Sequence, residues 1–279
     1  MLSLLFLLCA YQSQDVVRDN GLRLHVVQEG SGPPLLLIGG LGNRLQVWDA
    51  VVPSLANHFT VVRFDHRGLG QSGDLADAPY TLATMAEDAA AVMAALGHER
   101  YHLAGISLGS FVAQQLALTQ PERIVKLVLI ASSLGGPQHV APGPEVLGYF
   151  MTMAGMPRPE RVDKGLRLAL HSDFIEARPA VFAALTQAGI EDEPPAKTIQ
   201  RQMMVGMTFN HAEKARDIQV PTLLLHGAGD QVVPPENSRR LNEAIAGSAL
   251  VILPEAGHLC IVDQARATAV ALVAFLVGG

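Results

Sequence analysis

Three polar side chains, far apart along the chain, have the types and surroundings that nucleophilic catalysis needs. Ser107 lies at the centre of a Gly-Ile-Ser-Leu-Gly sequence, residues 105–109, between an apolar run and a helical segment. A G-x-S-x-G sequence between a strand and a helix is typical of a nucleophile elbow, a turn so tight that only glycine fits on either side of the serine. We therefore expect Ser107 to be a nucleophile. The alternative is a glycine-rich helix start in which serine is only the N-cap.

A serine hydroxyl is a weak nucleophile until a neighbouring base takes its proton. His258 follows an apolar run at residues 250–253, and Asp230 follows another at residues 223–225. Parallel strands end at one edge of a sheet, so both side chains can reach Ser107 from the same side. We predict that His258 is the general base and that Asp230 orients its imidazole and stabilises the imidazolium that forms.

Three other residues compete for these roles. His226 is the one rival histidine, because it lies close to Asp230 in the sequence. Glu255 and Asp263 flank His258, but they are too close along the chain to fold back easily onto its far nitrogen. We interpret Glu255 as a loop carboxylate and Asp263 as a helix N-cap.

Acyl transfer also needs two backbone N–H groups that stabilise an oxyanion. One should be the amide of Leu108, directly after the nucleophile. The other should come from the glycine-rich loop at residues 39–42, and we predict the amide of Leu41. The alternative is that this loop is only a tight strand-to-helix turn, although both descriptions can hold together.

The elements that must position these residues alternate between strand and helix, after a hairpin predicted by Asn20-Gly21. Such alternation predicts an α/β fold with a mostly parallel sheet flanked by helices. Apolar runs favour strands at residues 35–38, 60–64, 101–106, 124–130, 221–225 and 249–253, and helical patterns fall at residues 48–56, 82–96, 108–119 and 264–276.

The alternation lapses in one internal region, which has Gly-Pro interruptions and helical stretches but no convincing buried strand. We interpret this region as a helical cap inserted into the sheet domain. The predicted organisation is an N-terminal apolar segment (residues 1–14), a first core part (15–135), the inserted cap (136–216) and a second core part (217–279).

After residue 15 the chain resembles the α/β-hydrolase fold family over nearly its whole length. The resemblance implies a catalytic triad, an oxyanion hole and a lid domain over the nucleophile. One departure is that many relatives have His-Gly where this chain has Gly39-Gly40, so the packing that this histidine provides must be met differently. The matching stretches, in order, are residues 39–42 with Trp48, residues 65–72, the turn at Ser107, and the loops of Asp230 and His258. Of these, residues 65–72 are expected to secure a loop.

Serine as the nucleophile argues against the members that act on haloalkanes or epoxides through aspartate. The resemblance implies a carboxylesterase-like serine esterase, a hydrolase that cleaves esters of small, largely apolar substrates through an acyl-enzyme on Ser107 without a cofactor. Lactonases of the enol-lactone type, thioesterases, C–C bond hydrolases and cofactor-free haloperoxidases fit the same triad. A catalytically dead ligand receptor is the non-enzyme alternative, although none of the triad positions is missing.

Methionines gather in the inserted region, and their flexible, polarizable side chains suit apolar and variable substrate groups. The alternative is that they fill the interface between cap and core. The predicted substrate-binding residues are Met151, Met153, Met203, Met204 and Met207.

The expected partner is the small-molecule, ester-like substrate that the resemblance implies, and composition argues against other classes of partner. The net charge is −6 without a run of lysine and arginine, which argues against nucleic acid and anionic membrane surfaces. Cys9 and Cys260 are far apart, and the histidines lack an HExxH pattern, so we expect free thiols and no metal. The apolar start, residues 1–10, is too short to span a bilayer. We expect a cytoplasmic protein, with secretion through this segment as the alternative.

Overall fold

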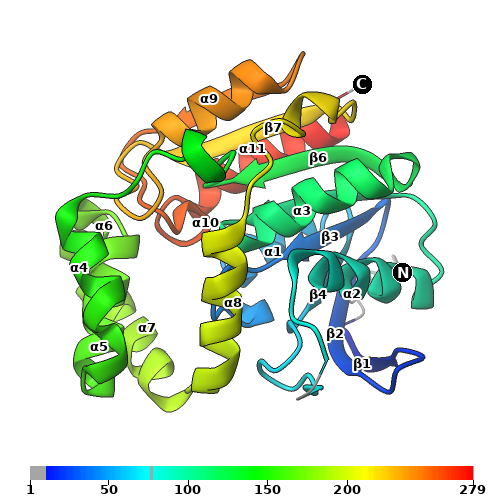
Figure 1. Ribbon diagram of the computed structural model, residues 1–279. Coiled ribbons are helices and arrows are strands. Elements are labelled where there is room, and N and C mark those ends of the chain that lie inside the picture. Colours follow the sequence, from blue (N-terminus) through cyan, green and yellow to red (C-terminus); the bar gives the residue numbers. More distant parts are fainter. Residues whose placement is uncertain (1–10, 76–77, 279) are drawn as a thin grey trace, which may run out of the picture.

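A mostly parallel β sheet forms the centre of the molecule (Figure 1). The computed structural model describes residues 11–75 and 78–278, and within them eight strands form one sheet in the order β1-β2-β4-β3-β5-β6-β7-β8. β1 and β2 are antiparallel to their neighbours, and the other neighbouring pairs are parallel. The strands are β1 (Gln12–Val17), β2 (Arg23–Gly30), β3 (Pro34–Ile38), β4 (Thr60–Phe64), β5 (Tyr101–Ile106), β6 (Ile124–Ile130), β7 (Thr222–Gly227) and β8 (Ala249–Leu253). The predicted α/β class and the hairpin between β1 and β2 are confirmed.

The N-terminal strand starts earlier than its apolar pattern suggested. β1 begins at Gln12, so residues 12–14, which we had placed in a separate segment, belong to the sheet. These residues are exposed and polar, and they pair with Val26, Val27 and Gln28 of β2 through the backbone. The apolar residues 1–10, with Cys9 among them, lie outside the described residues.

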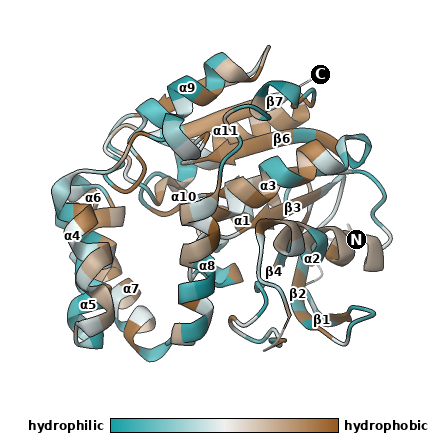
Figure 2. Cartoon of the chain, viewed as in Figure 1, coloured by the Kyte–Doolittle hydropathy of each residue, from teal (hydrophilic) through white to brown (hydrophobic). Residues whose placement is uncertain are grey.

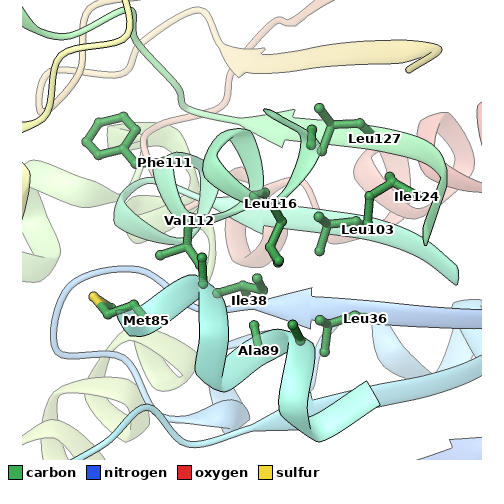
Figure 3. Close-up of a cluster of buried hydrophobic side chains, with 14 of the residues drawn as sticks. Leu36, Ile38, Met85, Ala89, Leu103, Phe111, Val112, Leu116, Ile124 and Leu127 are labelled. Carbon is green, nitrogen blue, oxygen red and sulfur yellow. The ribbon is translucent and has the colours of Figure 1, made fainter. Parts of the chain in front are cut away.

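Helices cover both faces of the sheet, so alternate residues of each strand enter two separate cores. Leu36 and Ile38 of β3 belong to one core with residues of helices α2 (Leu82–Ala95), α3 (Leu108–Thr119) and α9 (Glu236–Ala244), and Figure 3 shows the part of this core beside α2 and α3. Leu35 and Leu37 pack on the opposite face with α1 (Val52–Leu55), α10 (Cys260–Asp263) and α11 (Ala265–Val277). Burial on both faces explains why these strands read as continuous apolar runs, and Figure 2 shows hydrophobic residues concentrated on them.

One predicted helix is much shorter in the structure. Residues 48–56 do not form one helix, because a 3-10 turn (Leu45–Trp48) is followed by the single turn of α1. Pro53 lies at the start of α1 and has no backbone N–H to donate to a preceding turn, so it suits a helix start but not a helix interior.

Between β6 and β7 the chain forms a run of helices at one side of the sheet (Figure 1). Apart from an isolated bridge between Gly135 and Asn210, the described residues of this insertion contain no β pairing. Proline at the start of α4, α5 and α7 sets where these helices begin. The helices are α4 (Pro144–Thr152), α5 (Arg158–Ala169), α6 (Ser172–Ala177), α7 (Pro179–Glu191) and α8 (Ala196–Thr208).

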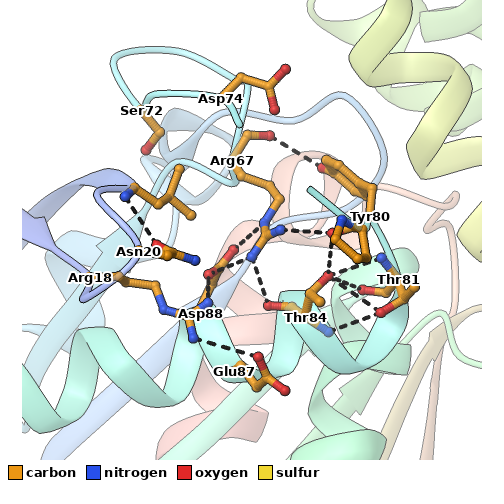
Figure 4. A network of polar contacts seen from close by, with 12 residues as sticks. Arg18, Asn20, Arg67, Ser72, Asp74, Tyr80, Thr81, Thr84, Glu87 and Asp88 are labelled. Atoms are coloured by element: carbon orange, nitrogen blue, oxygen red, sulfur yellow. Dashed lines mark hydrogen bonds and ion pairs between the residues drawn. The ribbon is translucent and has the colours of Figure 1, made fainter. Parts of the chain in front are cut away.

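The loop at residues 65–72 has the structural role expected of it. Asp65 accepts hydrogen bonds from the amides of Leu45 (2.9 Å) and Gln71 (3.0 Å). Arg67 donates to the buried carboxylate of Asp88 on α2 (2.8 Å), in the polar network that Figure 4 shows. These contacts fix the loop that follows β4 beside the end of β3.

Candidate active site

Ser107 occupies a sharp turn between β5 and α3. Its backbone has φ 54° and ψ −124°, and a positive φ is uncommon for a residue with a side chain. The glycines on either side are required by space: a Cβ on Gly105 would lie 2.2 Å from the carbonyl oxygen of Gly109, and a Cβ on Gly109 would lie 2.3 Å from that of Ile38. The turn therefore has the geometry that a nucleophile elbow needs.

Asp230 and His258 meet across two loops that follow β7 and β8. His258 Nδ1 lies 2.8 Å from Asp230 Oδ2, while Asp230 Oδ1 accepts the amides of Val232 (2.9 Å) and Val233 (2.8 Å). Burial alone would raise the pKa of Asp230, but the charges of His258 and His226 and their hydrogen bonds bring this pKa below its usual range. An ionised carboxylate only accepts, so Nδ1 of His258 carries a proton and Nε2 is left to accept one.

His226 contacts the same carboxylate from a fully buried position. Its Nε2 lies 3.0 Å from Asp230 Oδ2 and 2.7 Å from the carbonyl oxygen of Val233, and its Nδ1 lies 2.6 Å from Ser238 Oγ. Both ring nitrogens therefore have protein partners. The geometry favours His258 as the base and gives His226 the task of holding Asp230.

The link between Ser107 and His258 stays a prediction. Among the described residues the Ser107 hydroxyl makes no hydrogen bond to another side chain, and catalytic hydrogen bonds are often long before a substrate binds. The sheet brings the turn of Ser107 and the loop of His258 to one edge. At the ends of the strands, Ile106 of β5 pairs with Ile130 of β6, Ile130 pairs with Leu225 of β7, and Gly227 of β7 pairs with Leu253 of β8. This register supports the meeting of the two side chains.

The two predicted oxyanion donors lie on neighbouring segments. Leu108 is the first residue of α3, so its amide has no acceptor within the helix. Leu41 lies in a turn closed by the hydrogen bond from the Asn43 amide to the Gly40 carbonyl (3.2 Å). A Cβ on Gly40 would lie 3.2 Å from Ser107 Cβ, so this turn passes directly beside the nucleophile. The geometry supports an oxyanion hole here.

A histidine from the loop after β4 contacts the Gly39-Gly40 segment, where many relatives have His-Gly. A Cβ placed on Gly39 would make ordinary contacts with Asn43 Cβ (3.5 Å) and Val47 Cγ1 (3.7 Å). His66 Nε2 lies 3.0 Å from the Gly39 carbonyl oxygen, and burial lowers the pKa of His66, so a neutral imidazole donates this hydrogen bond. His66 thus holds the end of β3, and Asn43 and Val47 lie beside Gly39.

Asp263 has a different role from the one predicted. It is the last residue of α10, not the N-cap of α11, and its Oδ2 accepts the amides of Gly257 (2.7 Å) and His171 (2.9 Å). Gln264, the N-cap of α11, separates it from the first residue of that helix. Asp263 therefore ties the residue before His258 to the insertion, a contact that the sequence analysis missed.

The insertion also contacts the loops beside the candidate site directly. The amide of Leu259 donates to the carbonyl of Ala169 at the end of α5 (2.9 Å). A cavity of about 480 Å³ lies between the segment after α5 and the loop of Asp230, with His171, Gly229 and Gln231 in its lining. Ser107 and His258 do not line this cavity.

The structure does not gather the predicted methionines into one buried cluster. Met151, Met204 and Met207 are 85%, 60% and 78% exposed, while Met153 and Met203 are partly buried. Met204 lines a second cavity of about 320 Å³, which Ser107 does not line. A substrate-binding role for these residues stays a prediction.

Residues 11–75 and 78–278 contain no group of three or more histidine, cysteine, aspartate or glutamate side chains that could hold a metal ion. Cys260 is buried and free. In the same part of the chain, every helix is too short or too polar to cross a bilayer.

Comparisons with known proteins give the family. The sequence profile of the alpha/beta hydrolase fold matches residues 33–265, and the chain therefore belongs to the alpha/beta hydrolase fold family. It is 30% identical over 252 residues to the "Putative carbamate hydrolase RutD" of Caulobacter sp. (strain K31), covering 88% of this chain and 90% of that one. It is 31% identical over 243 residues to the pimeloyl-[acyl-carrier protein] methyl ester esterase of Nitrosomonas europaea, covering 84% and 92%. The crystal structure of the enol-lactonase from Burkholderia xenovorans LB400 superposes with a TM-score of 0.80 at 27% identity, covering 96% and 100%.

Proposed function

We propose that this protein is a serine hydrolase that cleaves carboxylic esters of small, largely apolar substrates. His258 takes the proton of Ser107, whose oxygen attacks the ester carbonyl, and the amides of Leu41 and Leu108 stabilise the oxyanion. His258 then protonates the leaving alcohol. Water repeats the sequence on the acyl-enzyme and releases the acid. Asp230 stays ionised throughout and stabilises the imidazolium.

The contact between Asp230 and His258 carries this proposal. A buried carboxylate with two backbone donors on one oxygen and His258 Nδ1 at 2.8 Å on the other fixes the tautomer that a general base requires. The strained backbone of Ser107 adds support, because such strain is common at active sites. The names of the relatives agree in chemistry, since a methyl ester, a lactone and a carbamate each carry an acyl carbon bonded to a heteroatom.

The insertion at residues 136–216 serves in this proposal as a lid over the nucleophile. It contacts the loops after three strands of the sheet: Gly42 after β3, Gly229 after β7 and Gly257 after β8. These loops are the ones that carry the proposed oxyanion donor, the acid and the base. A lid attached at these points would exclude water from the acyl-enzyme.

Ser107→Ala tests the proposal. The variant should lower kcat for a short aryl ester by roughly 10³- to 10⁶-fold while the fold is retained. Ser54→Ala, an exposed serine on α1, is the matched control and should leave kcat unchanged. Near-normal ester hydrolysis by Ser107→Ala would refute the mechanism.

A lactonase is the second candidate, and the likeness to the enol-lactonase favours it. A lactone is a cyclic ester, so the same residues would open it, and the alcohol would stay attached to the acyl group. Comparing kcat/KM for aryl esters and for enol-lactones separates the two. A fluorophosphonate that leaves Ser107 unlabelled would instead favour a ligand receptor.

A further inference from the structure

A buried glutamine of the insertion is hydrogen-bonded to the turn that holds the proposed oxyanion donor. Gln202, on α8, is fully buried, and its Oε1 accepts the backbone N–H of Gly42 at 2.7 Å. Gly42 directly follows Leu41. The contact therefore joins the lid to the oxyanion turn across 160 positions of sequence.

The hydrogen bond acts on the one peptide group that decides the shape of this turn. Gly40 and Asn43 close the turn, and Gly42 at its third position has φ +70°. A positive φ there is typical of a type II turn, which differs from type I by a flip of the central peptide. This peptide joins Leu41 to Gly42, and its N–H is the group that Gln202 holds. A side-chain acceptor at this point therefore opposes the flip.

The other end of the amide is also held. Gln202 Nε2 donates to the hydroxyl of Tyr80 (3.0 Å), and this hydroxyl donates to the main-chain carbonyl of Arg67 (3.3 Å; Figure 4). Arg67 is itself bonded to the buried Asp88. The carboxamide cannot rotate without losing both bonds, so its oxygen stays directed at Gly42.

We propose that Gln202 is a positioning residue that anchors this turn at Gly42. The Leu41 N–H belongs to the neighbouring Gly40–Leu41 peptide, and the anchored turn keeps this peptide, with its N–H, in place beside Ser107. The inference rests on the proposed function. It adds that the lid contributes to the alignment of the oxyanion hole, besides covering the site.

The test compares Gln202→Met with Gln200→Met. Methionine matches glutamine in length but offers no amide, and Gln200 is exposed on the same helix, so its variant controls for the change in α8. Gln202→Met should lower kcat for an aryl ester by roughly 10- to 100-fold, with KM changed less than about threefold, because a misdirected oxyanion donor acts on the transition state. Gln200→Met should keep the wild-type kcat.

A trifluoromethyl ketone analogue of the ester separates positioning from loss of structure. It adds to the nucleophile and places an oxyanion in the hole, so its inhibition constant should rise by the same factor as kcat/KM falls. Tyr80→Phe removes one hydroxyl and leaves the hydrogen bond between Gln202 and Gly42 in place. It should lower kcat and raise the inhibition constant by a smaller factor, and it serves as the test if Gln202→Met fails to fold.

A kcat within threefold of wild type in Gln202→Met would overturn the inference, as would a loss in kcat with an unchanged inhibition constant. If Gln202→Met fails to fold, a wild-type inhibition constant in Tyr80→Phe overturns it. Failure of the proposed function is distinct, because Ser107→Ala would then retain activity.

Discussion

Asp230→Asn is the sharpest single perturbation of the candidate site. The Oδ1 position of Asp230 faces the amides of Val232 and Val233, which are both donors, so the asparagine oxygen must occupy this position. Its NH₂ group then takes the Oδ2 position, where His258 and His226 present their own N–H groups. Two donors face each other in each of these contacts.

His258 can remove its donor–donor conflict by changing tautomer. Nδ1 then accepts a hydrogen bond from the asparagine NH₂, and Nε2 carries the proton. A protonated Nε2 cannot take the proton of Ser107. In a Ser-His-Asp triad this exchange lowers kcat about 10⁴-fold, which corresponds to about 5 kcal/mol at about 1.4 kcal/mol per tenfold change. We expect a loss between about 10³- and 10⁴-fold here, because the geometry of the two loops is otherwise kept.

The assay is steady-state hydrolysis of a short aryl ester, with circular dichroism to verify the fold. Glu255→Gln is the matched control, because Glu255 is an exposed carboxylate in the loop of His258 and should leave kcat unchanged. An Asp230→Asn variant that folds and keeps more than a tenth of wild-type kcat would refute the argument from the tautomer. A large loss in Glu255→Gln would mean that the wrong acid was assigned.

Two further predictions concern stability. Burial lowers the pKa of His211 from 6.5 to about 4. Between pH 6.5 and pH 4 the unfolded chain therefore binds a proton at His211 that the folded chain does not bind, so the free energy of unfolding decreases as the pH falls. In urea unfolding, the free energy of unfolding of the wild type should therefore decrease by about 2 kcal/mol more than that of His211→Phe between pH 7.5 and pH 5. Equal decreases in the two proteins would contradict this. Gly105→Ala should lower the free energy of unfolding by at least about 1–3 kcal/mol, because the new Cβ would lie 2.2 Å from the Gly109 carbonyl oxygen. Gly206→Ala, where a Cβ meets nothing within 4 Å, should instead gain stability, and equal midpoints in thermal unfolding would refute the packing argument.

The sheet was predictable because burial on both faces leaves continuous apolar runs. β5, β6 and β8 begin and end where their sequence patterns do. Residues 48–56 show where the pattern fails: apolar spacing favoured one helix, but Pro53 makes α1 start afresh. Residues 12–14 belong to β1 although they are polar and exposed, because their backbone groups pair with β2. An apolar pattern cannot predict such a segment.

Some contacts of the candidate site were also predictable from the sequence, and others were not. The Asp230–His258 contact followed from chain order and strand ends, which are local signals that a single sequence carries. The partners of Gln202 and Asp263 could not be predicted, because they bond to backbone amides of distant loops and no local pattern encodes such a partner. Sequence proximity to Asp230 makes His226 a rival base, but only the three-dimensional structure shows that it contacts the Asp230 carboxylate.

The crystal structure of the protein after reaction with a fluorophosphonate tests the central claim most directly. We predict phosphorus bonded to Ser107 Oγ, with one phosphoryl oxygen about 2.7–3.1 Å from the amide nitrogens of Leu41 and Leu108. His258 Nε2 should lie about 2.6–3.2 Å from an oxygen of the adduct, while Nδ1 keeps its contact with Asp230. A label on another residue, or an imidazole of His258 out of reach of the adduct, would contradict the account.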